Sequence, residues 1–223
     1  DRVLCLQFNQ KLRGLSAEEF IQQVLVDGLA VKHLVVGDDF RFGCDRRGDY
    51  ALLQLKGKEF GFAVSDTHTL EIDGARVSST RIRHLLETGN FDEATKLLGK
   101  PYGVHGRVVY GKQLGRQLGV PTANVDLRRY RSPLNGVFIV TVEFSDGSSG
   151  QGVANVGVRP TVAGDKKPLL EVHLFDFAKD IYGTVIDVTF CKKLRDEKKF
   201  ASLDELRNQL QLDISQGKEF FLP

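Results

Sequence analysis

The side chains with the clearest chemical potential lie in the stretch GKQLGRQLGVPTAN, residues 111–124. Its three glycines are four residues apart, so bare backbone can approach a polyanion, and two basic side chains add charge. If an extended segment begins at Pro121, the threonine and asparagine that follow point to one face as hard ligands for Mg²⁺. The residues alone leave an ordinary loop before a strand equally open, since glycine loops are weak evidence. The candidate residues for binding a polyanion are Gly111, Lys112, Gly115, Arg116, Gly119, Thr122 and Asn124, the last two also as metal ligands.

A later apolar run contains a carboxylate that is a candidate catalytic residue. In LEVHLFDF, residues 170–177, leucine and valine alternate with Glu171 and His173, so Glu171 would face away from a core. Carboxylates in such positions usually belong to a solvated face. The segment LRDE, which contains Arg195 and Asp196, is from its residues alone best described as a charged turn before the final helix.

Two segments of the first half have features of nucleotide sites. VSSTRIR places hydroxyls at a helix start with an arginine close by, which makes an anion site, although a plain N-cap fits equally well. GDDFRFG follows an apolar run, and ligands of α/β proteins bind at the ends of strands. The candidate residues are Asp39, Phe40, Phe42, Ser78, Ser79, Thr80 and Arg81.

The first half of the chain alternates apolar runs with helical periodicity. Residues 3–8 (VLCLQF) and 32–37 (KHLVVG) predict buried strands, and residues 16–25 predict a helix opened by a Ser16–Glu19 capping box. This alternation indicates an α/β domain with a largely parallel sheet. Further helices are predicted at 50–61, 79–87 and 91–99, and an extended run at 62–72.

From residue 100 onward the helical period disappears. Short β-rich runs separated by Gly, Asp, Ser and Pro predict an antiparallel barrel or sandwich. The last helix, residues 202–215, should open with a Ser202–Glu205 capping box and bury Leu203, Leu206 and Leu210. The chain therefore divides into an α/β domain (1–99) and a β domain (100–223).

Composition excludes several classes of protein. The 31 basic residues nearly balance the 29 acidic ones, which argues against a protein that binds nucleic acid over its whole surface. No apolar run approaches the ~18 residues that a membrane helix needs, so we expect no membrane helix. Cys5, Cys44 and Cys191 are scattered and form no CxxC pair, so we expect a reducing cytoplasm rather than disulfides or a zinc site. The 223 residues contain no methionine, which predicts a piece of a longer protein, trimmed at its N-terminus.

Several segments together resemble one enzyme family. GRQLGVPTANVDL resembles the GRxxGxPTAN signature of riboflavin kinases, and GVFIVTV, GVANVGVRPTV, LEVHLFDF and LRDEKKFASLDEL are similar to later segments of that family in order. VGDDFRFGCDRRGD and VSSTRIRHLLETG resemble the FMN adenylyltransferase domain of bacterial bifunctional FAD synthetases. The resemblance implies an incomplete, Rossmann-like nucleotidyltransferase domain followed by a β-barrel riboflavin kinase domain with a C-terminal helix.

The resemblance also implies roles for individual residues. ATP, Mg²⁺ and riboflavin would bind, and FMN would be the product. Thr122 and Asn124 would hold Mg²⁺ and nucleotide, and Glu171 would be the catalytic base. The loop with Arg195 and Asp196 would border the flavin. The SSTxxR-type motif would contact the ATP triphosphate of the adenylyltransferase.

The chain departs from the family pattern in its first half. An adenylyltransferase of this kind should open with a glycine–histidine motif of HxGH type, and the five histidines form none. The resemblance therefore implies an incomplete adenylyltransferase site beside a complete kinase half.

Two other functions are open. The segments RRYR and CKKLRDEKK suggest a nucleic-acid-binding barrel, but such runs are mostly solvated faces, and stacking aromatics are not interleaved with them. The second alternative is a module that binds flavin without catalysing a reaction. The combination of Glu171, Thr122 and Asn124 argues against it. We therefore expect small-molecule partners, with no nucleic acid and no membrane.

Overall fold

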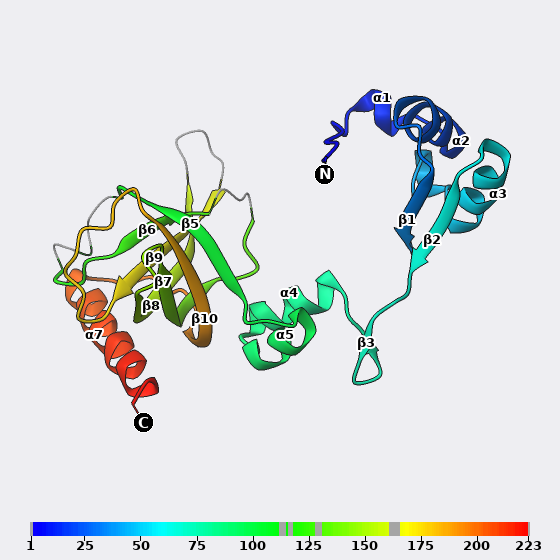
Figure 1. Cartoon of the computed structure of the whole chain (residues 1–223). Coiled ribbons are helices and arrows are strands. Elements are labelled where there is room, and N and C mark those ends of the chain that lie inside the picture. The colour runs from blue at the N-terminus through cyan, green and yellow to red at the C-terminus, as the bar shows by residue number, and fades with distance from the viewer. Residues whose placement is uncertain (1, 112–114, 116–117, 128–130, 161–165, 223) are drawn as a thin grey trace. The chain divides into compact units, whose positions relative to one another are not determined.

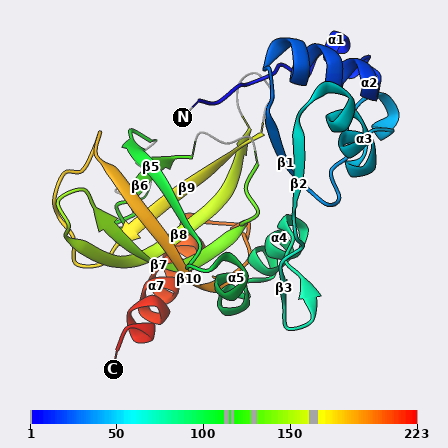
Figure 2. The same cartoon turned by 45° about the vertical axis from the view of Figure 1, so that its right-hand side comes forward.

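The computed structural model of the chain describes residues 2–111, 115, 118–127, 131–160 and 166–222. Contacts within the chain divide it into two compact units, Asp1–Val77 and Ser78–Pro223 (Figures 1 and 2). Each unit has a buried apolar core of its own.

The first unit is a small α/β assembly around two parallel strands. Strand β1 pairs with β2 from His33–Ala63 to Gly37–Thr67. Its core includes Ile21, Leu53 and Phe62, which come from helices and from the segment before β2. The elements are α1 (Gln10–Arg13), α2 (Ala17–Phe20), the π-helix η1 (Ile21–Gly28), β1 (His33–Gly37), the 3₁₀ helix η2 (Cys44–Arg46), α3 (Tyr50–Phe60), β2 (Ala63–Thr67), β3 (Glu71–Ile72) and β4 (Ala75–Arg76).

Local sequence signals account for most of this unit. The helix predicted at 16–25 is confirmed: the Ser16 hydroxyl accepts the Glu19 N–H at 3.1 Å, and the Glu19 carboxylate accepts the Ser16 N–H at 2.7 Å. The strand predicted at 3–8 is wrong. Val3 and Phe8 are 96% and 81% exposed, and no described segment pairs with this run. A strand needs a partner for its backbone N–H and C=O groups, and apolar composition does not supply one.

The second unit is a closed, six-stranded antiparallel barrel with helices before and after it. Around the barrel the strands follow the order β10, β5, β6, β9, β8, β7 and back to β10. Figure 1 shows α7 lying along the outside of the barrel. The elements are α4 (Ser79–Thr88), α5 (Phe91–Leu98), β5 (Gly103–Val109), β6 (Ala123–Asp126), β7 (Gly136–Phe144), β8 (Ser149–Pro160), β9 (Lys166–Leu174), β10 (Val185–Arg195) and α7 (Leu203–Phe220).

Helices α4 and α5 pack against the barrel core. Leu86, Phe91 and Ala94 are buried there, and the Phe91 ring lies 5.9 Å from Phe138 and 6.3 Å from Phe190, centroid to centroid. By packing, these helices belong with the barrel. The domain boundary near residue 99 stays a prediction.

Strand β10 carries two β-bulges opposite β7. The pairing register with β7 skips Cys191 and Leu194 and shifts at each of them. After the second shift, Arg195 pairs with Val137. A bulge inserts one residue and bends the strand, so the extra residues change which side chains of β10 face outward.

The C-terminal helix α7 is confirmed, and it extends to Phe220. Ser202 caps it by accepting the Glu205 N–H, but the Glu205 carboxylate accepts the N–H of Ala201, so the predicted capping box forms only in part. Leu203 is 61% exposed, and its predicted burial is wrong because it lies one turn before the part of the helix that covers the barrel. The face toward the barrel carries Leu206, Leu210, Asp213 and Gly217.

Candidate active site

Five side chains form one row across the barrel. Asn124 on β6 pairs with Glu171 on β9, and Glu171 pairs with Asn155 on β8. Asn155 pairs with Val137 on β7, and Val137 pairs with Arg195 on β10. Residues directly opposite each other on neighbouring strands point to the same face of a sheet. We call these five residues the outer row.

The outer row faces away from the barrel core. Leu170 and Val172, which flank Glu171, are buried in that core, so Glu171 points to the outside as the alternation predicts. Between this face and α7 lies a cavity of about 220 Å³, which we call the outer cavity. Its lining includes Val137, Asn155, Glu171 and Arg195 of the row, Leu206, Leu210 and Asp213 of α7, and Gly115, Leu118, Val120 and Thr122 from the preceding loop.

The glycine spacing of that loop has a steric cause. A Cβ at Gly111 would fall on the carboxamide of Asn124, and a Cβ at Gly115 would fall on the carbonyl of Val120. The Gly115 carbonyl accepts the N–H of Leu118 and of Val120, which closes the turn. Gly119 has a φ of 78°, in the left-handed region that favours glycine. Lys112 and Arg116 lie outside the described residues.

Asn124 has the chemistry of a ligand-binding residue. It is 4% exposed, and its Oδ1 has no hydrogen-bond partner among the described residues. A buried oxygen without a partner is costly, so it needs a donor or a cation. No group of three His, Cys, Asp or Glu among the described residues could hold a metal. A carboxamide oxygen and a hydroxyl are ligand types that Mg²⁺ accepts, so the chemistry of Asn124 and Thr122 fits this ion, whose binding stays a prediction.

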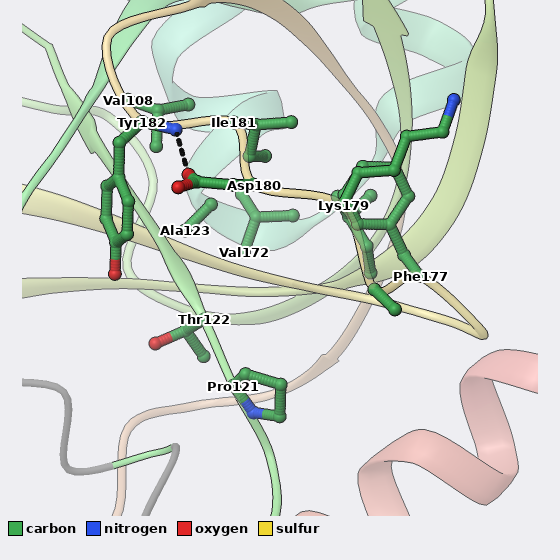
Figure 3. A pocket seen from close by; sticks show the side chains of 12 residues that line it. Val108, Pro121, Thr122, Ala123, Val172, Phe177, Lys179, Asp180, Ile181 and Tyr182 are labelled. Carbon is green, nitrogen blue, oxygen red and sulfur yellow. Dashed lines mark hydrogen bonds between the residues drawn. The ribbon is translucent and has the colours of Figure 1, made fainter.

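Thr122 lines a second cavity in addition to the outer one. This rim cavity, of about 270 Å³, is lined by Pro121, Thr122 and Ala123 on one side and by the segment 177–182 on the other (Figure 3). Figure 3 shows the segment with Asp180, Ile181 and Tyr182 on the side of the cavity across from Pro121 and Thr122. Within this segment, the Tyr182 N–H donates to the Asp180 carboxylate at 3.0 Å. Thr122 lines both cavities.

His173 is the nearest alternative to Glu171 as a base. Its Nδ1 lies 2.8 Å from the carbonyl oxygen of Pro121. Because a carbonyl only accepts, the imidazole must donate from this nitrogen, which leaves Nε2 as its accepting nitrogen. His173 and Glu171 both line the outer cavity, and His173 also contacts the backbone directly before Thr122.

The two residues predicted to border the flavin differ in position. Arg195 lines the outer cavity and forms an ion pair with Asp213 at 2.7 Å. Asp196 is exposed, and the ammonium group of Lys193, 2.7 Å away, holds the pKa of its carboxyl below the usual range. Asp196 is not among the described lining residues, and its role stays a prediction. Glu197, which sequence reasoning did not select, lines the cavity and lies against the bare Cα of Gly157.

The residues predicted for adenylyl transfer lie in different units. Phe42 is buried and stacks on Phe40, with ring centroids 5.5 Å apart, so core packing accounts for it. Asp39 pairs with Arg76 at 2.7 Å, and this arginine lowers the pKa of its carboxyl.

In the second unit, the Ser78 hydroxyl caps α4 by accepting the Arg81 N–H at 3.2 Å. The Arg81 guanidinium pairs with Glu93, also at 3.2 Å. Ser79 and Thr80 are exposed at the start of this helix. The roles of all these residues stay predictions.

Known proteins match the whole chain. The riboflavin kinase family model matches residues 98–221, and the FAD synthetase model matches residues 1–81. A bifunctional riboflavin kinase/FMN adenylyltransferase from Pseudomonas fluorescens is 55% identical over 100% of this chain and 71% of the relative. The chain belongs to the bifunctional riboflavin kinase/FMN adenylyltransferase family.

Other members of the riboflavin kinase/FMN adenylyltransferase family agree with this placement. The Escherichia coli K12 enzyme of the same name is 50% identical over 99% of this chain and 70% of its own length. Family membership confirms the expected order of a nucleotidyltransferase-like region followed by a kinase barrel.

A solved structure described as a macrolide-efflux protein from Streptococcus pneumoniae also matches, at 36% identity and a TM-score of 0.67. The match covers 92% of this chain and 66% of that one. Among the described residues of this chain, no helix is both long and apolar enough to cross a bilayer.

Proposed function

We propose that this chain phosphorylates riboflavin at its 5′-hydroxyl with MgATP, forming FMN and ADP. The observation that carries the proposal is that Thr122, close to Asn124 and the glycine loop, lines two cavities. Phosphoryl transfer requires an acceptor and a donor that approach the same phosphorus in line. Two cavities that share Thr122 as a wall residue support this proposal.

The chemistry of the walls assigns one substrate to each cavity. The outer cavity offers Leu118, Val137 and Phe200 as apolar surface beside a few polar groups, which suits a flat, largely apolar ring such as that of riboflavin. The rim cavity is assigned to the nucleotide, and Thr122, two residues before Asn124, lines it as well as the outer cavity. Lys112 and Arg116 would add positive charge near the phosphates.

Glu171 is the proposed catalytic base. It accepts the proton of the 5′-hydroxyl while that oxygen attacks the γ-phosphorus, and the bond from phosphorus to the departing ADP oxygen breaks. When bound, Mg²⁺ would offset the negative charge that develops on the phosphates. Thr122 and Asn124 would hold that ion, and His173 would keep the backbone before Thr122 in place.

The relatives carry a second activity in their name, FMN adenylyltransferase. For this chain, the kinase reaction is the one that its residues support most directly, since no HxGH-type motif occurs in the sequence. We propose that it acts in the cytoplasm, where thiols such as Cys5 and Cys44 stay reduced, on small molecules rather than nucleic acid.

A product assay tests the proposal. The chain is incubated with riboflavin and ATP, with Mg²⁺ or with a chelator, and the flavins and nucleotides are separated. We expect FMN and ADP in equal amounts, and neither with the chelator. Riboflavin binding without FMN would instead identify a flavin-binding module, and the absence of both would refute the proposal.

A further inference from the structure

A buried carboxylate lies on the face of α7 that covers the barrel. Asp213 is 1% exposed and follows Leu206 and Leu210 at helical spacing, a position where packing alone would favour an apolar side chain. Burying a charge is costly unless it is paired and hydrogen-bonded. A carboxylate at this position therefore needs an explanation beyond packing.

Asp213 holds the guanidinium group of Arg195 along one edge. The Arg195 Nε–H donates to Oδ1 at 3.0 Å, and Nη2 donates to Oδ2 at 2.7 Å. The Gln209 side chain donates a further hydrogen bond to Oδ1 at 2.9 Å. Such a two-point contact fixes the plane of the guanidinium as well as its position.

Other contacts complete the hold on Arg195. Its Nη1 donates to the carbonyl of Asp196 at 3.0 Å, and its carbon Cζ lies 5.8 Å from the centre of the Phe200 ring. A guanidinium has five N–H groups, and these contacts use three of them. One N–H on Nη1 and one on Nη2 have no partner among the described residues, on a side chain that lines the outer cavity.

We propose that Asp213 is a positioning residue that, with Gln209, fixes Arg195 so that its two remaining donors meet the carbonyl-bearing edge of the flavin ring. The inference rests on the proposed function, because it takes the outer cavity as the riboflavin site. The pyrimidine part of a flavin carries neighbouring oxygen and nitrogen acceptors, which match a planar double donor. Lysine, a point charge on a flexible stem, does not match them.

The position of this contact determines its kinetic effect. Arg195 would touch the ring, whereas Glu171 acts at the 5′-hydroxyl. A contact made equally in the ground state and the transition state changes KM and leaves kcat unchanged. If the role of Asp213 were purely structural, its substitution would instead lower thermal stability. It would then raise the KM values for both riboflavin and ATP, or change neither.

The test measures FMN formation with riboflavin and ATP varied separately. Asp213→Asn keeps the shape and removes the charge. We expect it to raise the riboflavin KM about tenfold or more, since a hydrogen bond between charged groups is lost. The ATP KM and kcat should stay within about twofold. Asp204→Asn makes the same change at an exposed position of the same helix and should have no effect.

A double variant and a milder variant separate positioning from folding. If Asp213 acts through Arg195, Arg195→Lys combined with Asp213→Asn should be no worse than Arg195→Lys alone. Because breaking a buried pair can unfold a protein, Gln209→Met provides a second test. It removes one donor to Asp213 at similar side-chain length and should give a smaller rise in the same KM.

Each outcome decides between the two proposals. The role of Asp213 is overturned if the riboflavin KM is unchanged in both Asp213→Asn and Gln209→Met. It is also overturned if the KM values for riboflavin and ATP rise equally, and in both cases the kinase assignment stands. A wild-type chain that forms no FMN overturns the proposed function. Riboflavin fluorescence titration of Asp213→Asn then still tests the contact, which fails if riboflavin binds the variant and the wild type equally.

Discussion

Glu171 and Asn124 lie opposite each other on β9 and β6, but their surroundings differ. Glu171 lines a cavity large enough for part of a substrate, whereas Asn124 is buried against Gly111 with an oxygen that has no partner among the described residues. The first arrangement suits a group that exchanges a proton, and the second suits a group that binds a cation.

We expect Glu171→Gln to fold and to bind riboflavin and ATP, with kcat lowered by roughly 10²–10⁴-fold. The amide keeps the shape of the carboxylate but cannot accept the proton of the 5′-hydroxyl. A loss smaller than this would indicate that Glu171 mainly orients the hydroxyl, since phosphoryl transfer is often dissociative. Single-turnover FMN formation measures the effect.

Glu143→Gln is the matched control for Glu171→Gln. Glu143 is exposed on β7 and lines neither cavity, so its variant should retain full activity. A Glu171→Gln enzyme with unchanged kcat would refute the base assignment, and His173→Gln would then be the next variant to measure.

Asn124→Ala should remove MgATP binding without loss of stability. The substitution deletes a buried oxygen that has no partner among the described residues, so the free energy of unfolding of the free protein should stay the same or rise. The increase in Tm that MgATP gives the wild type should disappear, while the increase given by riboflavin should remain. An Asn124→Ala protein that MgATP still stabilises would contradict the metal assignment.

Glycines in the loop before β6 allow its backbone to lie against Asn124 and Val120, where a side chain would not fit. Gly111→Ala should raise the KM for MgATP, because the added methyl group would displace the carboxamide of Asn124. Gly147→Ala is the contrasting variant. Gly147 has a φ of 81° and open space around it, so alanine there should cost about 1 kcal/mol of stability and leave both KM values unchanged.

If Gly111→Ala and Gly147→Ala have the same effect on the MgATP KM, then the contact between Gly111 and Asn124 is not what sets nucleotide affinity. Steady-state kinetics with ATP varied at saturating riboflavin makes the comparison.

Sequence reasoning found the elements that local signals determine. The Ser16–Glu19 cap, the helices and the β-rich runs follow from spacing within one segment, and alternation places Glu171 on the outer face. It was wrong for residues 3–8, where a strand depends on a partner, and for Leu203, where burial depends on how far the helix overlaps the barrel.

The outer row itself was not predictable from one sequence. Its members come from five strands, and strand register brings them together only in three dimensions. Asp213 did leave a signal, a carboxylate at an apolar position of a helical stripe, but its meaning requires knowing that Arg195 lies opposite.

The division into two compact units predicts where the shortest fragment with kinase activity begins. We expect residues 78–223 to fold and to phosphorylate riboflavin, because this unit contains both cavities and the helices that pack on the barrel core. A shorter fragment, residues 100–223, follows the predicted domain boundary but lacks Leu86, Phe91 and Ala94. Urea unfolding should show it to be less stable by at least about 3 kcal/mol, the cost of losing one large buried aromatic side chain.

Fragments of equal stability would show that the barrel does not need α4 and α5, and would support the boundary near residue 99. A stable fragment 78–223 that forms no FMN would place a required group in the first unit.

The second bulge of β10 determines which of two neighbouring residues, Leu194 or Arg195, lines the outer cavity. If the strand continued regularly from the pair Lys193–Phe138, Leu194 would lie opposite Val137 and Arg195 would turn to the other face. Deleting Leu194 would therefore leave the guanidinium at the cavity. Exchanging Leu194 and Arg195 with each other would remove it, although length, composition and net charge all stay the same. At this position the order of Leu194 and Arg195 in the chain, and not composition alone, determines which side chain lines the cavity.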